Sequence, residues 1–259
     1  MAAAWQVLAR SDAKLAAVIR LVGPCALEPS LNPPYEALLS AIAHQQLHGV
    51  AARAILGRLA ALDGGPTLPS PAALLACPDD RLRGVGLSRS KLAAMRDVAA
   101  RTLDGTVPDL PAMSAMDDEA IIERLVAVRG VGRWTAQMIL ISTLGRPDVM
   151  PADDYGVRLG YQWAFGLAEL PKPRELLTLT ERFAPFRSTV ALYFWRYVDL
   201  RRANGTAPAP PAAAVAPAKG RRKARSRTAA SAGEGRLPGA GARGTGAGRK
   251  KATPKATRR

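Results

Sequence analysis

The chain has 259 residues and a formal net charge of +16, and its two cysteines, Cys25 and Cys77, lie far apart in the sequence. Two isolated cysteines exclude a zinc ribbon or an iron–sulfur cluster built from this chain, and no apolar stretch is long enough to cross a membrane. The N-terminus lacks a charged segment followed by an apolar run, so we expect a soluble cytoplasmic protein.

The positive charge is concentrated in the last part of the chain. Residues 1–202 contain 23 Lys or Arg and 20 Asp or Glu, whereas residues 203–259 contain 14 Lys or Arg and a single acid, Glu234. This tail has no aromatic residue and few large aliphatic residues, so it cannot bury enough apolar surface to offset the entropy of ordering. We therefore predict one folded domain and a disordered basic tail. The tail either contacts nucleic-acid phosphates or only solubilises the protein.

Helical patterns dominate the first part of the folded domain, because Ala, Leu and Arg are frequent and alternating β-branched runs are scarce. After Pro33 and Pro34, the run YEALLSAIAHQQLHGVAARAILGRLAAL predicts one long helix. A short helix is predicted at 71–76, and residues 79–102 predict a turn followed by another helix.

The second part of the domain is also predicted to be helical. Ser114 and Asp117 have the spacing of a capping box that would open the next helix. A further helix is predicted to start within PADDYGVRLGYQWAF at 151–165, and the last helices run from about Pro173 to Arg202. The predicted fold class is therefore all-α.

A polar patch, His44-Gln45-Gln46-Leu47-His48, interrupts the apolar pattern of the first long helix. His44 and His48 are four residues apart, a spacing that can bind a metal ion on a helix. No glutamate follows His44 directly and no third ligand lies nearby, so we predict no metal site. A polar surface that contacts a partner is favoured over an ordinary solvated face.

The tetrapeptide Arg-Gly-Val-Gly occurs twice, at 83–86 and at 129–132, each time between helical patterns. Glycines let the backbone approach a partner closely, and the N-terminus of the following helix offers N–H groups to a phosphate. The repeat predicts two similar tight turns between helices. These turns are either purely structural or bind DNA phosphates without reading sequence.

Two acids, Asp153 and Asp154, follow Pro151 at the predicted start of a helix. Either carboxylate could serve only as a helix cap, because Asp is favoured at the N-cap and in the first turn. The alternative is a carboxylate that faces a cleft and takes part in chemistry. Residue types alone favour the cap.

Large aromatic residues form a second candidate feature. Trp134 and Met138 share one side of a predicted helix, and Trp195 lies in the aromatic run of RSTVALYFWRYVDL. At such spacing, aromatic residues pack in a core more often than they line a ligand pocket. Both interpretations stay open from this pattern.

Five segments, taken together, are more specific than any one of them. They are AIAHQQLHGVAARAI, GVGLSRSKLAAM, VRGVGRWTAQMILISTLG, DVMPADDYGVRLG and APFRSTVALYFW, and they cover most of residues 35–202 in order. The chain thereby resembles the helix-hairpin-helix/Gly-Pro-Asp superfamily of DNA glycosylases, and within it the 3-methyladenine DNA glycosylase II family. The resemblance implies a two-lobed helical fold, with lobes at approximately 36–136 and at 1–35 plus 137–202. About 34 residues precede the first shared segment, which implies a compact form without the N-terminal β-domain of some relatives.

The resemblance also implies catalytic roles. The family's catalytic aspartate falls on Asp154, which makes Asp153 its neighbour and a capping residue. The family often has proline directly before the acidic pair, whereas Pro151 lies one position earlier here, so Asp153 is the fallback. Bifunctional relatives carry a Schiff-base lysine directly after the GVGR motif. Trp134 stands at that position, which implies a monofunctional enzyme.

Substrate and DNA contacts follow from the same resemblance. Trp134 and Trp195 match aromatic pocket positions, and Met138 stands where some relatives have tyrosine. Gln46 falls where the family places the residue that fills the gap left by a flipped base, and His48 would lie nearby in the minor groove. Phosphate contacts are implied for two sets of residues: Gly130, Val131, Gly132 and Arg133, and Gly86, Ser88, Arg89 and Lys91.

The implied activity is hydrolysis of the N-glycosidic bond of alkylated bases, such as 3-methyladenine and 7-methylguanine, in base-excision repair. The implied partner is double-stranded DNA containing alkylated bases, bound by a monomer associated with a bacterial nucleoid and without membrane contact. No metal or cofactor is expected, apart from a candidate monovalent cation site at hairpin carbonyls around Gly130. The open alternatives are a glycosylase for other damaged or mispaired bases and a non-catalytic helix-hairpin-helix DNA-binding protein.

Overall fold

A computed structural model describes residues 3–205, and these residues form helices without any β-strand. The all-α prediction is therefore confirmed. Beyond Gly205, the tail that was predicted to be disordered lies outside the described residues. No helix within 3–205 is long and apolar enough to span a membrane.

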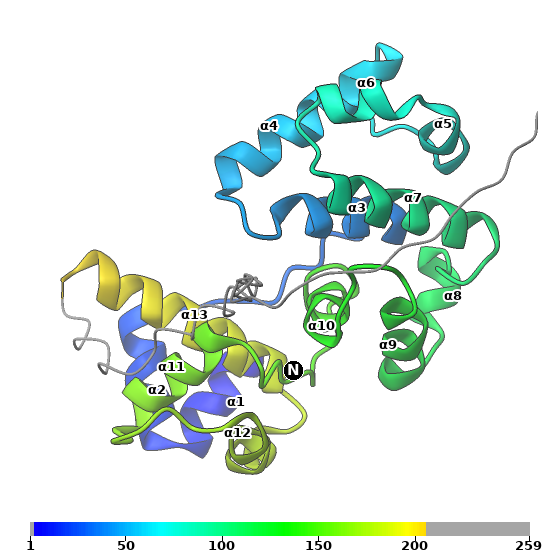
Figure 1. Ribbon diagram of the computed structural model, residues 1–259. Coiled ribbons are helices and arrows are strands. Elements are labelled where there is room, and N and C mark those ends of the chain that lie inside the picture. Colours follow the sequence, from blue (N-terminus) through cyan, green and yellow to red (C-terminus); the bar gives the residue numbers. More distant parts are fainter. Residues whose placement is uncertain (1–2, 206–259) are drawn as a thin grey trace, which may run out of the picture. The chain divides into compact units, whose positions relative to one another are not determined.

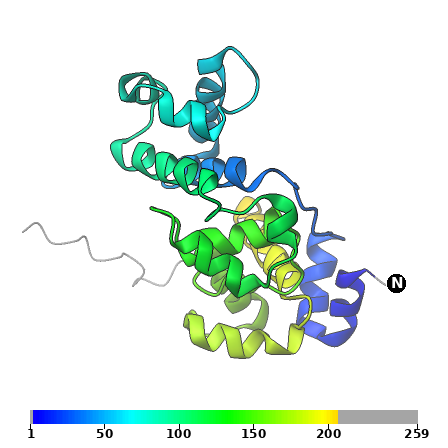
Figure 2. The same ribbon diagram turned by 90° about the vertical axis from the view of Figure 1, so that its right-hand side faces the viewer.

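Two groups of helices build the described part of the chain (Figures 1 and 2). The first group contains α3 (Pro34–His44), α4 (Gly49–Ala60), the 3-10 turn η1 (Ala61–Asp63), α5 (Pro71–Ala76), α6 (Asp79–Gly84), α7 (Arg89–Leu103), α8 (Leu110–Ser114), α9 (Asp118–Val126) and α10 (Arg133–Ser142). The second group contains α1 (Ala4–Ser11), α2 (Ala13–Val22), α11 (Tyr155–Phe165), α12 (Pro173–Thr180), the 3-10 turn η2 (Glu181–Phe183) and α13 (Arg187–Ala203).

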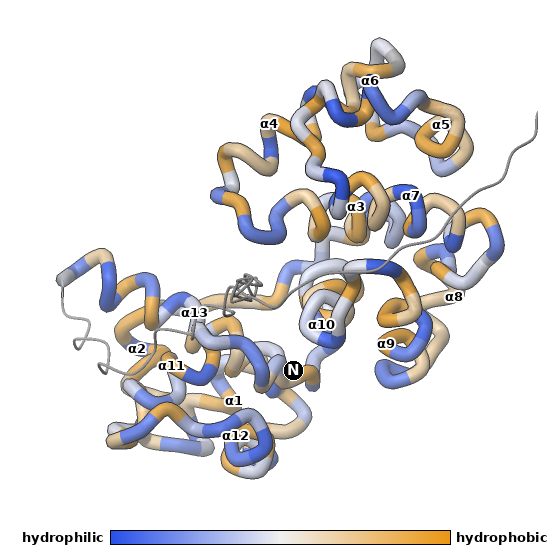
Figure 3. Tube along the Cα trace, in the orientation of Figure 1, coloured by the Kyte–Doolittle hydropathy of each residue, from blue (hydrophilic) through white to orange (hydrophobic). Residues whose placement is uncertain are grey.

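Each group of helices surrounds its own cluster of buried apolar side chains. The first cluster runs from Tyr35 to Val149, and the second combines residues 8–25 with residues from Met150 to Tyr197. Figure 3 shows apolar and polar residues alternating along the helices, as expected when one side of each helix is buried. The clusters divide after Val149 rather than near residue 136, because α10 packs its apolar side against α3 and α9.

The prediction of one long helix after Pro34 is wrong, because the segment forms two helices, α3 and α4. Gln45 leaves the helical conformation with ψ 125°, and Gln46 adopts a left-handed φ of 57°. His44 and His48 consequently lie on opposite sides of a turn rather than one helical turn apart. Within residues 3–205, no three His, Cys, Asp or Glu side chains gather closely enough to hold a metal ion.

Two local turn predictions also differ from the structure. Ser114 closes the short helix α8, and the residue before α9 is Asp117, so the expected capping box is absent there. The two Arg-Gly-Val-Gly turns are not alike: the left-handed residue is the second glycine, Gly86, in one and the first glycine, Gly130, in the other. The same four residues therefore adopt two different backbone conformations.

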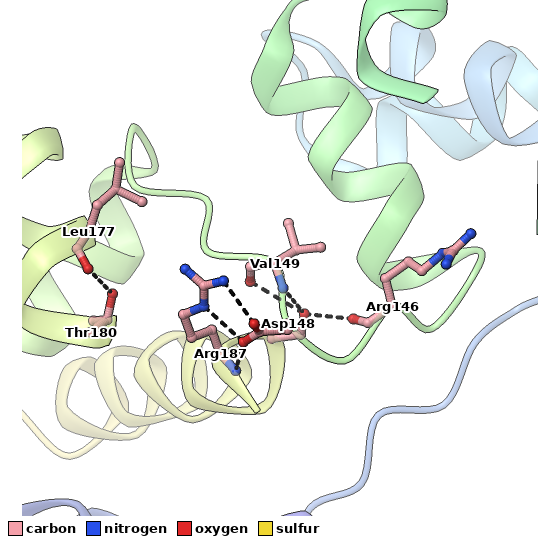
Figure 4. Close-up of polar contacts among 7 residues, drawn as sticks. Arg146, Asp148, Val149, Leu177, Thr180 and Arg187 are labelled. Carbon is pink, nitrogen blue, oxygen red and sulfur yellow. Dashed lines mark hydrogen bonds and ion pairs between the residues drawn. The ribbon is translucent and has the colours of Figure 1, made fainter. Parts of the chain in front are cut away.

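A network of hydrogen bonds ties the start of α13 to the segment between α10 and α11 (Figure 4). The guanidinium of Arg187 donates to both carboxylate oxygens of Asp148, at 2.8 Å each. The hydroxyl of Ser188 donates to the Arg146 carbonyl at 2.7 Å and accepts from the Val149 amide at 2.8 Å. A bidentate ion pair with fixed geometry is among the stronger polar contacts in proteins. It joins the helix that carries Trp195 to the segment that leads to the acidic pair.

This ion pair predicts a pH-dependent contribution to stability. Hydrogen bonds from Arg187 lower the pKa of the Asp148 carboxyl. The carboxylate therefore stabilises the fold above the pKa of an unfolded Asp, about 3.9, and this contribution is lost as pH falls toward the lower folded value. We expect Asp148→Asn to lower Tm by several degrees at pH 7, and by much less near pH 3. Thermal unfolding followed by circular dichroism checks this, and an equal loss at both pH values would contradict it.

Candidate active site

The carboxylate of Asp154 accepts three hydrogen bonds from three different elements. Its Oδ1 atom accepts from the Val157 amide at 2.9 Å and from the Trp195 indole at 2.9 Å. Its Oδ2 atom accepts from the Trp134 indole at 2.8 Å. Asp154 is thereby the N-cap of α11. The expectation that Asp153 caps this helix is wrong, because that side chain is exposed and the capping bond belongs to its neighbour.

Two glycines on α11 allow α13 to approach closely enough for the Trp195 indole to reach the Asp154 carboxylate. A Cβ atom on Gly156 would lie 3.0 Å from Cδ1 of Trp195, and one on Gly160 would lie 2.4 Å from Cβ of Phe194. Glycines four residues apart lie on the same side of a helix, so they form one close-contact stripe. Sequence reasoning missed this pair, although the spacing Gly-Val-Arg-Leu-Gly was its visible signal.

A cavity of about 730 Å³ lies on the other side of Trp134, whose indole N–H donates to the Asp154 carboxylate; Asp154 itself is not part of the lining. Trp134 lines the cavity, is 43% exposed, and at the same time donates its indole N–H to Asp154. The lining mixes polar and apolar side chains and contains no Asp, Glu, Lys or Arg. It comprises Ser30, Asn32, Ala37, Ser40, Ala41, His44, Gln45, Gln46, Gly130, Gly132, Trp134, Thr135, Met138, Ile139, Ser142 and Thr143. Its volume is in the range of small-molecule sites.

The two tryptophans therefore occupy different environments. Trp134 and Met138 both line the cavity. Trp195 is half buried and packs against both apolar clusters, while its N–H reaches the carboxylate. Trp195 thus packs in the core and also contacts the Asp154 carboxylate. The spacing of aromatic residues in the sequence could not show that one residue does both.

The turn between α3 and α4 projects polar side chains at the mouth of the cavity. Gln46 and His48 are both exposed, and Gln46 also lines the cavity. The left-handed φ of Gln46 is unfavourable for a non-glycine residue, and such strain gathers at functional sites. The neighbouring Gln45 donates its Nε2 hydrogen to the Gly130 carbonyl at 2.9 Å. This bond joins the turn to the hairpin before α10.

The hairpin at 128–132 has the geometry of an anion site. Gly130 adopts φ 77°, and its missing side chain leaves room for Ala94, which an added Cβ would meet at 3.2 Å. The Arg129 amide donates to Asp97 at 2.7 Å, which anchors the hairpin to α7. Among the described residues, no side chain caps the N-terminus of α10, which begins after Gly132. Its first-turn N–H groups are available to a phosphate.

The second set of expected phosphate contacts, around α7, is more closely engaged with the protein itself. Ser88 caps α7 by accepting from the Lys91 amide at 3.3 Å, and Gly86 takes φ 102° just before it. The ammonium of Lys91 donates to the Ala43 carbonyl at 2.6 Å, and burial lowers the pKa of this lysine. Arg89 is exposed at the start of the helix. Lys91 is thus directed toward α3, while Arg89 stays accessible.

Comparison with known proteins places this site in a family. Residues 39–185 match the family described as HhH-GPD superfamily base excision DNA repair protein. The chain belongs to the HhH-GPD superfamily. The curated DNA-3-methyladenine glycosylase 1 of Schizosaccharomyces pombe is 36% identical over 181 residues, which cover 69% of this chain and 79% of that protein. The resemblance inferred from the five segments is therefore confirmed.

Two solved structures of 3-methyladenine DNA glycosylases have a similar fold. The 3-methyladenine DNA glycosylase of Schizosaccharomyces pombe, solved in complex with abasic DNA, superposes with a TM-score of 0.69 at 35% identity, covering 74% of this chain and 95% of that one. The DNA-3-methyladenine glycosidase of Bacillus halodurans superposes with a TM-score of 0.68 at 31% identity, covering 76% and 89%. The chain therefore shares its fold with these two solved glycosylase structures.

Proposed function

We propose that this HhH-GPD protein is a monofunctional DNA glycosylase. It acts as a monomer on double-stranded DNA and hydrolyses the N-glycosidic bond of alkylated bases such as 3-methyladenine and 7-methylguanine. The observation that carries the proposal is the Asp154 carboxylate, held by two indoles beside a cavity of about 730 Å³. The names of the relatives in Schizosaccharomyces pombe and Bacillus halodurans support the class of substrate.

In the first step the damaged nucleotide leaves the base stack and enters the cavity. Extrusion costs a few kcal/mol, and least for damaged or poorly stacked bases. Gln46, at the mouth of the cavity, fills the gap in the duplex, with His48 beside it. The N–H groups that follow Gly132 hold a backbone phosphate, so that the sugar stays next to Asp154.

In the second step the bond between the sugar and the base breaks. An alkylated purine of this kind carries a positive charge and leaves as a neutral base, so it needs no strong general acid. The sugar develops oxocarbenium character, which a fixed carboxylate stabilises electrostatically. Trp134 supports a cationic base through its π face, an interaction of about 0.5–2 kcal/mol.

Water then adds to the sugar carbon and loses a proton. A carboxylate has about four acceptor positions, and three of those on Asp154 are filled, two at Oδ1 and one at Oδ2. The remaining position is on Oδ2, which is the atom that accepts a hydrogen bond from the attacking water and takes its proton. The products are an abasic site and the free base, and no strand break follows because Trp134 offers no amine for a Schiff base.

Incubation of the protein with methylated duplex DNA tests this proposal. Mass spectrometry of the supernatant should detect free 3-methyladenine or 7-methylguanine, and denaturing electrophoresis should show intact strands until alkali cleaves the abasic sites. Binding without any released base would identify a non-catalytic DNA-binding protein. Release of other bases alone would assign a different damage class, and strand breaks without alkali would exclude monofunctional hydrolysis.

The indole N–H groups predict a graded effect on catalysis. Trp195→Phe keeps an aromatic ring but removes the donor to Oδ1 of Asp154. Losing a hydrogen bond to a charged group costs about 1.5–3 kcal/mol, so we expect single-turnover excision to slow by about 10- to 100-fold. Trp163→Phe is the matched control, because Trp163 packs in the same cluster and has no bond to the carboxylate. Equal excision rates in wild type, Trp195→Phe and Trp163→Phe would contradict the positioning role of Trp195.

A further inference from the structure

We propose that a second cavity, between α10 and the start of α12, binds a phosphate that flanks the flipped nucleotide. The phosphate belongs to the same DNA strand, and Lys172 and Arg174 hold it. This inference rests on the proposed function, because it extends the DNA path of the same active site. It adds residues that the family resemblance did not point to.

The second cavity has a volume of about 530 Å³ and lies on a different side of α10 from the first. Arg133 and Gln137 face it, whereas Trp134 and Met138 face the first cavity, as expected for adjacent stripes of one helix. The complete lining is Arg133, Gln137, Met150, Ala152, Asp153, Lys172, Pro173, Arg174 and Leu177.

Positive charge predominates at this cavity. Three of its lining residues are cationic and one, Asp153, is acidic. Arg133 is already paired with Glu119, at 3.0 Å between Nη1 and Oε2. Lys172 and Arg174 are exposed, and neither has an ion-pair partner within residues 3–205. Two exposed cations without ion-pair partners at the rim of a cavity favour an anionic ligand.

Glu175, the acid that follows Arg174 in the sequence, forms no ion pair with these cations. Glu175 is not part of the lining, and its Oε2 atom accepts from the Lys172 amide at 3.2 Å. That bond directs the carboxylate to the backbone at the start of α12.

One buried amide in the lining of this cavity has an unpaired acceptor atom. Gln137 is only 8% exposed, and its Oε1 atom has no partner. Its Nε2 atom is 3.4 Å from the Met150 carbonyl, which leaves Oε1 as the unsatisfied acceptor. This buried acceptor lies behind the cationic rim of the cavity.

The position of the cavity fits the path of a DNA strand. Asp153 lines the cavity and Asp154 binds the indoles, and consecutive Cα atoms are only about 3.8 Å apart. A strand whose sugar lies at Asp154 continues past the adjoining Asp153, and the proposal places its next phosphate at the cavity that Asp153, Lys172 and Arg174 line.

The salt dependence of DNA binding tests the proposal. Fluorescence anisotropy is measured with a duplex that contains an uncleavable abasic-site analogue, over about 50–200 mM salt. For wild type and Lys172→Ala/Arg174→Ala, log K is plotted against log salt. Loss of this one phosphate contact should reduce the slope by about 1. The matched control is Arg10→Ala/Arg20→Ala, which removes the same charge from exposed positions on α1 and α2 and should leave the slope unchanged.

Three outcomes decide the inference. A slope reduced in the α12 variant and restored in Lys172→Arg/Arg174→Lys, which keeps both charges, supports it. An unchanged slope overturns it, and so does an equal reduction in both alanine variants, because that would reflect overall charge rather than a site. Failure of the proposed function is recognised separately, since wild-type protein would then release no base whatever the slopes show.

Discussion

Asp154→Asn is expected to slow the release of 3-methyladenine by about 100- to 1000-fold, which is the usual cost of removing one electrostatic stabiliser of a transition state. Asparagine keeps the shape and remains a good N-cap for α11, so the fold should persist. It lacks the negative charge that opposes the oxocarbenium ion. Single-turnover excision from methylated duplex DNA measures the effect, and anisotropy should show little change in DNA affinity.

Two further substitutions make this result specific. Asp199→Asn removes an exposed acid from α13 in the same group of helices and should leave excision unchanged. Asp153→Asn tests the neighbouring acid, whose exposed side chain accepts no bond from either indole. Loss of excision in that variant, with normal excision in Asp154→Asn, would transfer the catalytic role to Asp153.

Gly160→Ala is expected to destabilise the protein by about 3 kcal/mol, the upper part of the range for overpacked cores. An added Cβ would lie 2.4 Å from Cβ and 2.7 Å from the carbonyl oxygen of Phe194, so α11 and α13 must separate. Because Trp195 follows directly on α13, its bond to Asp154 should lengthen as well. Denaturant unfolding measures the stability loss, and excision should fall in parallel under conditions where the protein remains folded.

A glycine-to-alanine substitution in another helix should instead raise the stability of the protein. Gly57 is exposed within α4, and an added Cβ meets nothing within 4 Å. Alanine is favoured over glycine in a helix by about 0.8–1.0 kcal/mol, so Gly57→Ala should stabilise the protein by about that amount. If both variants unfolded at the same denaturant concentration, the close approach of α11 and α13 would not be the cause of the difference.

Most helices could be predicted because their apolar side chains recur at helical spacing. The break at Gln45 and Gln46 could not, because the residues on both sides continue a helical pattern. A contact with a distant part of the chain accompanies that break, namely the bond from Gln45 to the Gly130 carbonyl. Similarly, the two Arg-Gly-Val-Gly turns have the same residues but different neighbours. Gly86 packs beside Ile55 and Arg58, and Gly130 packs beside Ala94.

The sequence by itself determined the all-helical class, the family, the acidic pair and the two tryptophans. These features follow from local spacing and from ordered motifs. Only the tertiary structure decided that Asp154 is both the cap of α11 and the acceptor for the indoles of Trp134 and Trp195. Three elements that are separate in the chain must meet within hydrogen-bond distance for this, and side-chain direction across such separations depends on packing rather than on local preference.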